Sequence, residues 1–86
     1  MEPVEYPING VLDLHQFQPS DTHSLVPEYL EMCREKGIYR VQIIHGKGIG
    51  VQREIVHSIL KKIPWVIDFS LSGSWGSTLA NLSPED

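Results

Sequence analysis

Ile43-Ile44-His45-Gly46-Lys47-Gly48-Ile49-Gly50 is the stretch around which the rest of this chain can be interpreted. An apolar run ends in a histidine, glycine follows at every second position, and a helical pattern then begins. Strand, glycine loop and helix in this order bring backbone N–H groups and a helix N-terminus onto a phosphate. The loop is neither a Walker A loop nor a GxGxxG loop, because no Ser or Thr follows a Gly-Lys pair and Val51 stands where a glycine is needed. Glycines at these spacings also suit a tight loop without a ligand, so the flanking elements decide the interpretation.

The flanking elements follow the order β-α-β-α-β-β. Apolar alternation or short apolar runs predict strands over residues 11–15, 39–45, 65–71 and 77–82. A helix with an apolar stripe is expected from Val51 until Pro64 ends it. An earlier helix is expected to stop at Gly37. Its start has two alternatives, either a first turn that precedes Pro27 or a start with Pro27 itself near the first helical position.

This element order predicts an α/β fold. Each strand–helix–strand connection implies parallel neighbouring strands joined by a right-handed crossover. Two helices suffice to cover one face of a sheet, which gives a two-layer sandwich with a mixed four-stranded sheet. Residues 1–10 are expected to form an extended arm, residues 11–82 the domain, and residues 83–86 a frayed tail.

Composition places the chain among small globular proteins. It has 86 residues, of which 41% are hydrophobic and 21% charged. Cys33 stands alone, so a disulfide framework and a cysteine-based zinc site are both excluded, and a reducing compartment is expected. No apolar run approaches the length of about 18 residues that a membrane span needs, and no basic segment followed by an apolar one is found, so we expect neither a membrane span nor a secretion signal. We therefore expect a cytoplasmic protein, whose oligomeric state the sequence leaves open.

Charge is distributed unevenly along the chain. The net charge is −4, yet all seven basic residues lie between positions 34 and 62 together with only two acids. That window carries +5, whereas the nine other acids give the remainder −9. A basic patch on an acidic protein is sufficient for contact with phosphates, although solvated helix faces would produce the same pattern.

Three polar side chains are expected at one edge of the sheet. Asp13 and His15 share a face at the end of the first strand, and His45 ends the second. The carboxyl ends of parallel strands form the usual ligand site of an open α/β sheet. An acid beside two imidazoles can orient a tautomer, move a proton near neutral pH, or stabilise charge on a phosphate. Taken singly, each of these residues is more often structural.

Other candidate residues add to this edge. Arg53 follows the loop, and Trp75 between glycines would be either a platform for stacking a base or simply a packed ring. His23 and His57 are expected on helical or pre-helical surface and are assigned no role. A zinc site from the acid and two histidines is conceivable but disfavoured, so no cofactor is expected to be required; a divalent metal is possible but unsupported.

Together these motifs resemble the Smr (small MutS-related) domain family over about residues 10–82. The resemblance is carried by Leu12-Asp13-Leu14-His15, by Ile44-His45-Gly46-Lys47-Gly48-Ile49-Gly50, and by Gly73 with Trp75-Gly76-Ser77-Thr78-Leu79. It implies the two-layer sandwich also found in the C-terminal domain of bacterial translation initiation factor three. It further implies binding of DNA or RNA and, in several members, endonuclease activity.

By position, the resemblance makes Asp13 and His15 the catalytic or charge-handling centre, helped by His45. It makes His45-Gly46-Lys47-Gly48 the phosphate-binding loop, and we expect the backbone amides as far as Gly50 to hold the phosphate with Lys47. One departure is visible: the family often has glycine after the first histidine, whereas this chain has Gln16. A side chain there changes how closely a backbone can approach.

The sequence is compatible with three functions. The first is an endonuclease that makes single cuts in DNA or RNA, either by hydrolysis or by attack of an RNA 2′-hydroxyl. The second, which Gln16 favours, is a non-catalytic module that binds structured nucleic acid through Lys47 and Arg53 with salt-dependent affinity. The third is a protein–protein adaptor that uses the acidic remainder of the surface.

Overall fold

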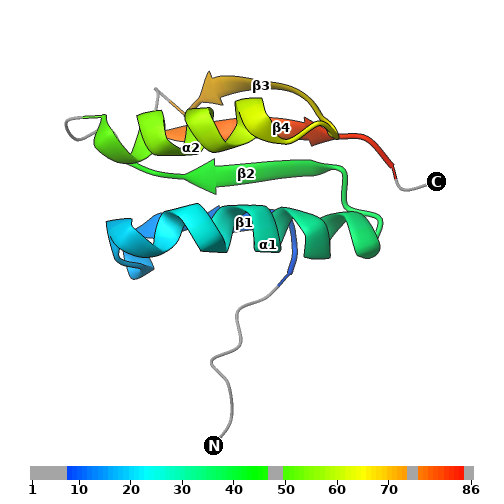
Figure 1. Cartoon of the computed structure of the whole chain (residues 1–86), viewed down its shortest axis with the longest axis horizontal. Helices are drawn as coiled ribbons and strands as arrows, with labels where there is room; N and C mark the ends of the chain where they lie inside the picture. Colours follow the sequence, from blue (N-terminus) through cyan, green and yellow to red (C-terminus); the bar gives the residue numbers. More distant parts are fainter. Residues whose placement is uncertain (1–7, 47–49, 74–75, 85–86) are drawn as a thin grey trace, which may run out of the picture.

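The computed structural model describes residues 8–46, 50–73 and 76–84 of the chain. The elements of this part are β1 Val11–Asp13, α1 Thr22–Glu35, β2 Arg40–Ile44, α2 Val51–Lys62, β3 Val66–Ser72 and β4 Ser77–Leu82, with two short 3-10 turns, η1 Leu14–Gln16 and η2 Pro19–Asp21. Figure 1 shows α1 and α2 on the same face of a single sheet. The two-layer α/β sandwich predicted from the sequence is therefore confirmed.

The sheet is mixed, with the strand order β1-β2-β4-β3. β1 and β2 are parallel neighbours, as the first crossover predicts. For the second crossover only the direction is confirmed. β2 and β3 run parallel, but they are not neighbours, because β4 lies between them and pairs antiparallel with both. Burial explains the order: β4 buries most of its residues, whereas β3 leaves Ile67 64% exposed, so β4 takes the central place and β3 the edge.

The core fills the space between the sheet and the helices. Its buried members are Leu12, Leu14, Val26, Tyr29, Leu30, Cys33, Val41, Ile43, Val56, Ile59, Leu60, Ala80 and Leu82. Burial of each large aliphatic side chain stabilises the fold by roughly 1.5–3 kcal/mol. Cys33 is a free buried thiol, and burial raises its pKa.

Helix α1 begins before its proline and continues through it. It starts at Thr22, so Pro27 is the sixth residue, and the structure selects the alternative in which a first turn precedes the proline. At the other end Gly37 has a φ of 79°, and the N–H groups of Gly37 and Ile38 donate to the carbonyls of Arg34 and Cys33. This Schellman motif is the stop predicted from the glycine.

Strand β1 is shorter than the sequence predicts. Its pairing with β2 ends at Asp13, which lies opposite Ile44, and the chain then turns into η1 rather than continuing to His15. The Asp13 side chain caps this turn by accepting a hydrogen bond from the His15 backbone N–H, at 2.9 Å. A short acidic side chain that bonds its own backbone competes in this way with the sheet ladder.

None of the helices in the described part of the chain has both the length and the apolar character needed to span a membrane.

Candidate functional site

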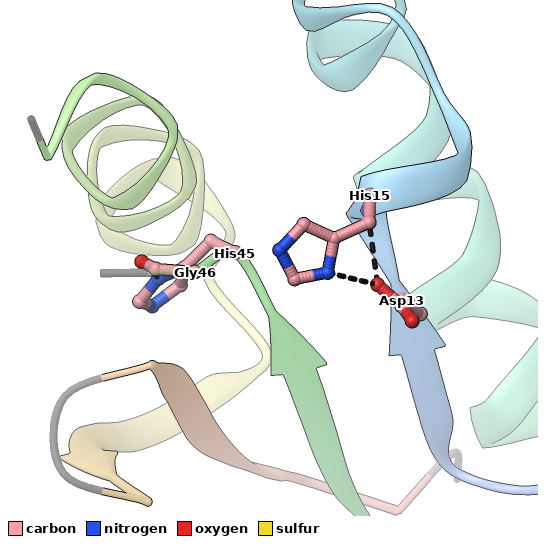
Figure 2. A network of polar contacts seen from close by, with 4 residues as sticks. All are labelled: Asp13, His15, His45 and Gly46. Carbon is pink, nitrogen blue, oxygen red and sulfur yellow. Dashed lines mark hydrogen bonds and ion pairs between the residues drawn. The ribbon is translucent and has the colours of Figure 1, made fainter. Parts of the chain in front are cut away.

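The site lies at the edge of the sheet where β1 and β2 both end. Asp13 and Ile44 are register partners at the last rung of the parallel pairing. The residues that follow each strand, His15 in η1 and the pair His45 and Gly46 after β2, therefore come together at one place (Figure 2).

Asp13 and His15 form a hydrogen-bonded pair at this edge. The His15 ring Nδ1 lies 2.8 Å from Asp13 Oδ1, and the same oxygen accepts the His15 backbone N–H. Because a carboxylate only accepts hydrogen bonds, His15 Nδ1 must carry a proton, which leaves Nε2 of the neutral ring with a free lone pair. The side chains are 62% and 40% exposed for His15 and Asp13, so a polymer can reach them.

Nε2 of His15, which has no hydrogen-bond partner among the described residues, faces the start of the glycine loop. A Cβ added to Gly46 would lie 2.9 Å from His15 Nε2, closer than real Cβ contacts allow. Gly46 also has a φ of 81°, and its N–H donates to the Gly76 carbonyl at 2.9 Å. The glycine therefore lets the two strand ends approach each other, and the β3–β4 turn holds it there.

The sequence predicts that His45 and His15 reach a common ligand, but the structure places the His45 side chain elsewhere. Its side chain is buried, 7% exposed, and its ring points away from the Asp13–His15 pair (Figure 2). Its Nδ1 lies 3.0 Å from the Gly46 carbonyl oxygen and its Nε2 lies 2.8 Å from Thr78 Oγ1. The structure thus brings Asp13, His15 and Gly46 together, whereas the His45 ring is buried against Thr78.

His57 also lies in this neighbourhood, although no sequence pattern predicts a role for it. Its Nε2 lies 2.8 Å from the same Thr78 Oγ1, and its ring stands edge-on to that of His45 with centroids 6.2 Å apart. Burial lowers the pKa of His57, and the charges of His45, Arg53 and Lys61 lower it further. Its partner is 21 residues away in the sequence, so only the packing of α2 on β4 reveals the contact.

Arg53 lies at the N-terminus of α2, at the far end of the glycine loop. Gly50 caps that helix with a φ of 84°, and a Cβ on it would come 2.7 Å from Arg53 Nη2. The guanidinium therefore folds back over Gly50, beside the backbone N–H groups that begin the helix. A cation and a helix N-terminus together favour an anion. The predicted binding residues Lys47, Gly48 and Trp75 lie outside the described residues.

Basic side chains continue along the outer surface of α2. A shallow hollow of about 410 Å³ is lined by Glu54, His57, Ser58, Lys61 and Lys62. Two of these side chains, Lys61 and Lys62, are positive and one, Glu54, is negative, so the positive charge lies towards the C-terminal end of the helix. Among the residues that the structure describes, no three His, Cys, Asp or Glu side chains are grouped closely enough to hold a metal ion.

This α/β sandwich has an acid–histidine pair beside a glycine that begins a loop. Comparison with known proteins identifies the family to which a chain of this kind belongs. The family model of the Smr domain matches residues 12–83. The chain belongs to the Smr domain family.

Its relatives in sequence include much longer proteins. The chain is 33% identical over 79 residues to endonuclease MutS2 of Halothermothrix orenii, covering 87% of this chain and 10% of that protein. It is 35% identical over 75 residues to endonuclease MutS2 of Brevibacillus brevis, covering 83% and 10%. The chain thus spans about a tenth of the length of these relatives.

Two solved structures share the fold. The Smr domain of Thermus thermophilus MutS2 has a TM-score of 0.79 at 26% identity and covers 86% of this chain and 98% of that one. YdaL, a stand-alone small MutS-related protein from Escherichia coli, has a TM-score of 0.80 at 21% identity and covers 92% and 68%.

Proposed function

We propose that this Smr domain is an endonuclease that makes single phosphodiester cuts in DNA or RNA. The observation that carries the proposal is the Asp13–His15 pair, whose Nε2 faces Gly46 at the start of the glycine loop and has no hydrogen-bond partner in the described part of the chain. A histidine fixed in one tautomer by a carboxylate, with its second nitrogen open, is the arrangement of a general base. The endonuclease names of the MutS2 relatives support the same activity.

In this mechanism His15 Nε2 removes a proton from the attacking oxygen. That oxygen belongs to water when DNA is cut, and to water or the adjacent 2′-hydroxyl when RNA is cut. Asp13 keeps the proton of His15 on Nδ1 and stabilises the imidazolium that forms. As the new P–O bond forms, the bond to the leaving oxygen breaks, and that oxygen takes a proton from solvent.

The phosphate would be held by the glycine loop and by the start of α2. Gly46 and Gly50 lie at the two ends of the loop, and Arg53 supplies a guanidinium next to Gly50. We propose that Lys47 and Gly48, within the loop, also contact the phosphate. A guanidinium binds phosphate with two parallel hydrogen bonds, which orients as well as attracts it.

The buried thiol of Cys33 supports a reducing, cytoplasmic location.

The inward position of His45 changes the role proposed for it. A ring that is 7% exposed and bonded at both nitrogens cannot reach the phosphate without rearrangement. We therefore propose that His45 holds the loop rather than exchanging protons with the substrate.

A second candidate function is binding of structured nucleic acid without cleavage. Gln16 favours it, because this chain has glutamine directly after His15 in the sequence, where the family often has glycine. The same loop and Arg53 would then dock the phosphate backbone with an affinity that falls as salt rises.

The deciding experiment incubates the protein with supercoiled plasmid and with structured RNA, each with and without EDTA. The proposal expects nicked plasmid or discrete RNA cuts that Asp13→Ala and His15→Ala both abolish. Salt-dependent binding without cutting in any condition would support the binding module. No affinity for either polynucleotide would point to a protein–protein adaptor.

A further inference from the structure

Four residues, from α2, β4 and the segment that follows β2, form a continuous hydrogen-bonded chain next to the site. His57 on α2 contacts Thr78 on β4 at 2.8 Å, Thr78 contacts His45 at 2.8 Å, and His45 contacts the Gly46 carbonyl at 3.0 Å. Gly46 in turn lies against His15 Nε2. The chain therefore runs from the middle of α2 to the proposed general base.

The donor and acceptor at each step follow from chemistry. A carbonyl oxygen only accepts, so His45 Nδ1 carries the proton that it donates to Gly46. Nε2 of the neutral His45 ring must then accept, and the Thr78 hydroxyl is the donor available to it. Since that hydroxyl has only one proton, His57 Nε2 must donate to the Thr78 oxygen. Every proton in the chain thus points towards Gly46.

We propose that His57 and Thr78 are positioning residues of this site, which hold His45 in the tautomer with the proton on Nδ1 and thereby fix Gly46 under His15. The inference rests on the proposed function, because it concerns the placement of its general base. His57 and Thr78 act through His45 and Gly46 and do not touch the substrate.

Burial gives the chain its strength. Thr78 is fully buried, 0% exposed, so its hydroxyl has no water to replace a lost protein partner. Among the described residues, every buried side-chain nitrogen and oxygen has a hydrogen-bond partner. Replacing the hydroxyl by a methyl would leave two imidazole nitrogens facing an apolar group, and the Gly46 carbonyl alone would then hold the His45 ring and its tautomer.

The test compares Thr78→Val with Thr78→Ser, and His57→Leu with His57→Gln. Valine and leucine remove the hydrogen-bonding atoms, whereas serine keeps the hydroxyl and the glutamine amide keeps an N–H donor. Thr22→Val is the matched control for Thr78, since Thr22 is also 0% exposed and its hydroxyl bonds only Gln52 among the described residues. His23→Leu, on the exposed surface of α1, is the control for His57.

Two readouts are measured, the NMR shifts of the His45 ring nitrogens in the free protein and the rate of cutting at saturating polynucleotide. Thr78→Val and His57→Leu should move His45 away from its single tautomer and slow cutting by about tenfold, with affinity nearly unchanged. Thr78→Ser and His57→Gln should restore both readouts, and neither control should change either one.

Unchanged ring-nitrogen shifts in Thr78→Val and His57→Leu would overturn the proposal. An equal loss of cutting in Thr22→Val would also overturn it, because the effect would then be one of general stability. If the wild-type protein cuts nothing, the proposed function fails, and the shifts measured in the free protein alone decide for or against the positioning role.

Discussion

His15 Nε2 and the Cα of Gly46 lie so close that a Cβ on the glycine would come within 2.9 Å of the nitrogen. This contact joins the two strand ends that the sheet brings together. It also makes a single methyl group a probe of the site, because adding one at Gly46 must displace the His15 ring.

Gly46→Ala should therefore slow cutting by about tenfold or more, since the proposed general base moves off its position. Alanine at a φ of 81° also destabilises the fold by roughly 1–2 kcal/mol. Cutting rates at saturating substrate and denaturant unfolding measure the two effects separately.

Gly37→Ala separates strain from displacement. Gly37 has a φ of 79°, so alanine costs a similar strain there, but a Cβ would meet nothing within 4 Å. The variant should lose similar stability and keep the full cutting rate. If Gly37→Ala and Gly46→Ala slowed cutting equally, contact between His15 and Gly46 would have no special role.

Arg53→Ala should weaken polynucleotide binding and lower the slope of log affinity against log salt by about one, as expected for one lost phosphate contact. Arg53 lies over Gly50 at the loop end of α2. Arg40→Ala is the control, because Arg40 is exposed at the opposite end of β2. Fluorescence titrations at several salt concentrations measure both, and an equal effect of the two substitutions would count against a localised phosphate site.

His57 should make stability depend on pH. Its pKa in the folded protein is lowered below the ordinary value of 6.5, first by burial and then by His45, Arg53 and Lys61. The unfolded chain therefore binds the proton on His57 more readily than the folded protein does. The contribution of neutral His57 to the free energy of unfolding is complete above pH 6.5 and is lost as the pH falls through the pKa of the folded protein.

Urea unfolding of the wild type and of His57→Gln across this range tests the point. The wild-type free energy of unfolding should fall more steeply below pH 6.5 than that of the variant. His23→Gln removes an exposed histidine and should leave the wild-type slope in place. Identical slopes for the wild type and His57→Gln would contradict the predicted shift.

Much of the fold could be predicted from the sequence because burial imposes its period on each element. The start of α2 at Val51 and the bounds of β4 follow from local pattern, and so does the stop at Gly37. The position of β4 could not be predicted, because a strand's period does not name its neighbours. The strand order depends on which strand is covered by a neighbouring strand on both sides. β4 is covered in this way, whereas β3, with its exposed Ile67, lies at the edge of the sheet.

The candidate site could also be predicted only in part from the sequence. Asp13 and His15 are two residues apart, and local geometry brings them together even though a 3-10 turn replaces the end of the predicted strand. The ring of His45 is turned inward by Thr78, 33 residues away, and His57 reaches the same hydroxyl from another helix. Contacts over such separations follow from packing and leave no local pattern in the sequence.

The rate of plasmid or RNA cutting by Asp13→Asn is the decisive test of the Asp13–His15 pair. The amide fills the same space but does not hold the proton on His15 Nδ1 as the carboxylate does, so cutting should fall by at least about a hundredfold with polynucleotide affinity retained. Asp68→Asn is the control, because Asp68 also accepts a side-chain hydrogen bond, from Asn81 at 2.6 Å, but lies on the edge strand β3. Wild-type cutting by Asp13→Asn would contradict the account, since the Asp13–His15 pair would then have no part in the chemistry.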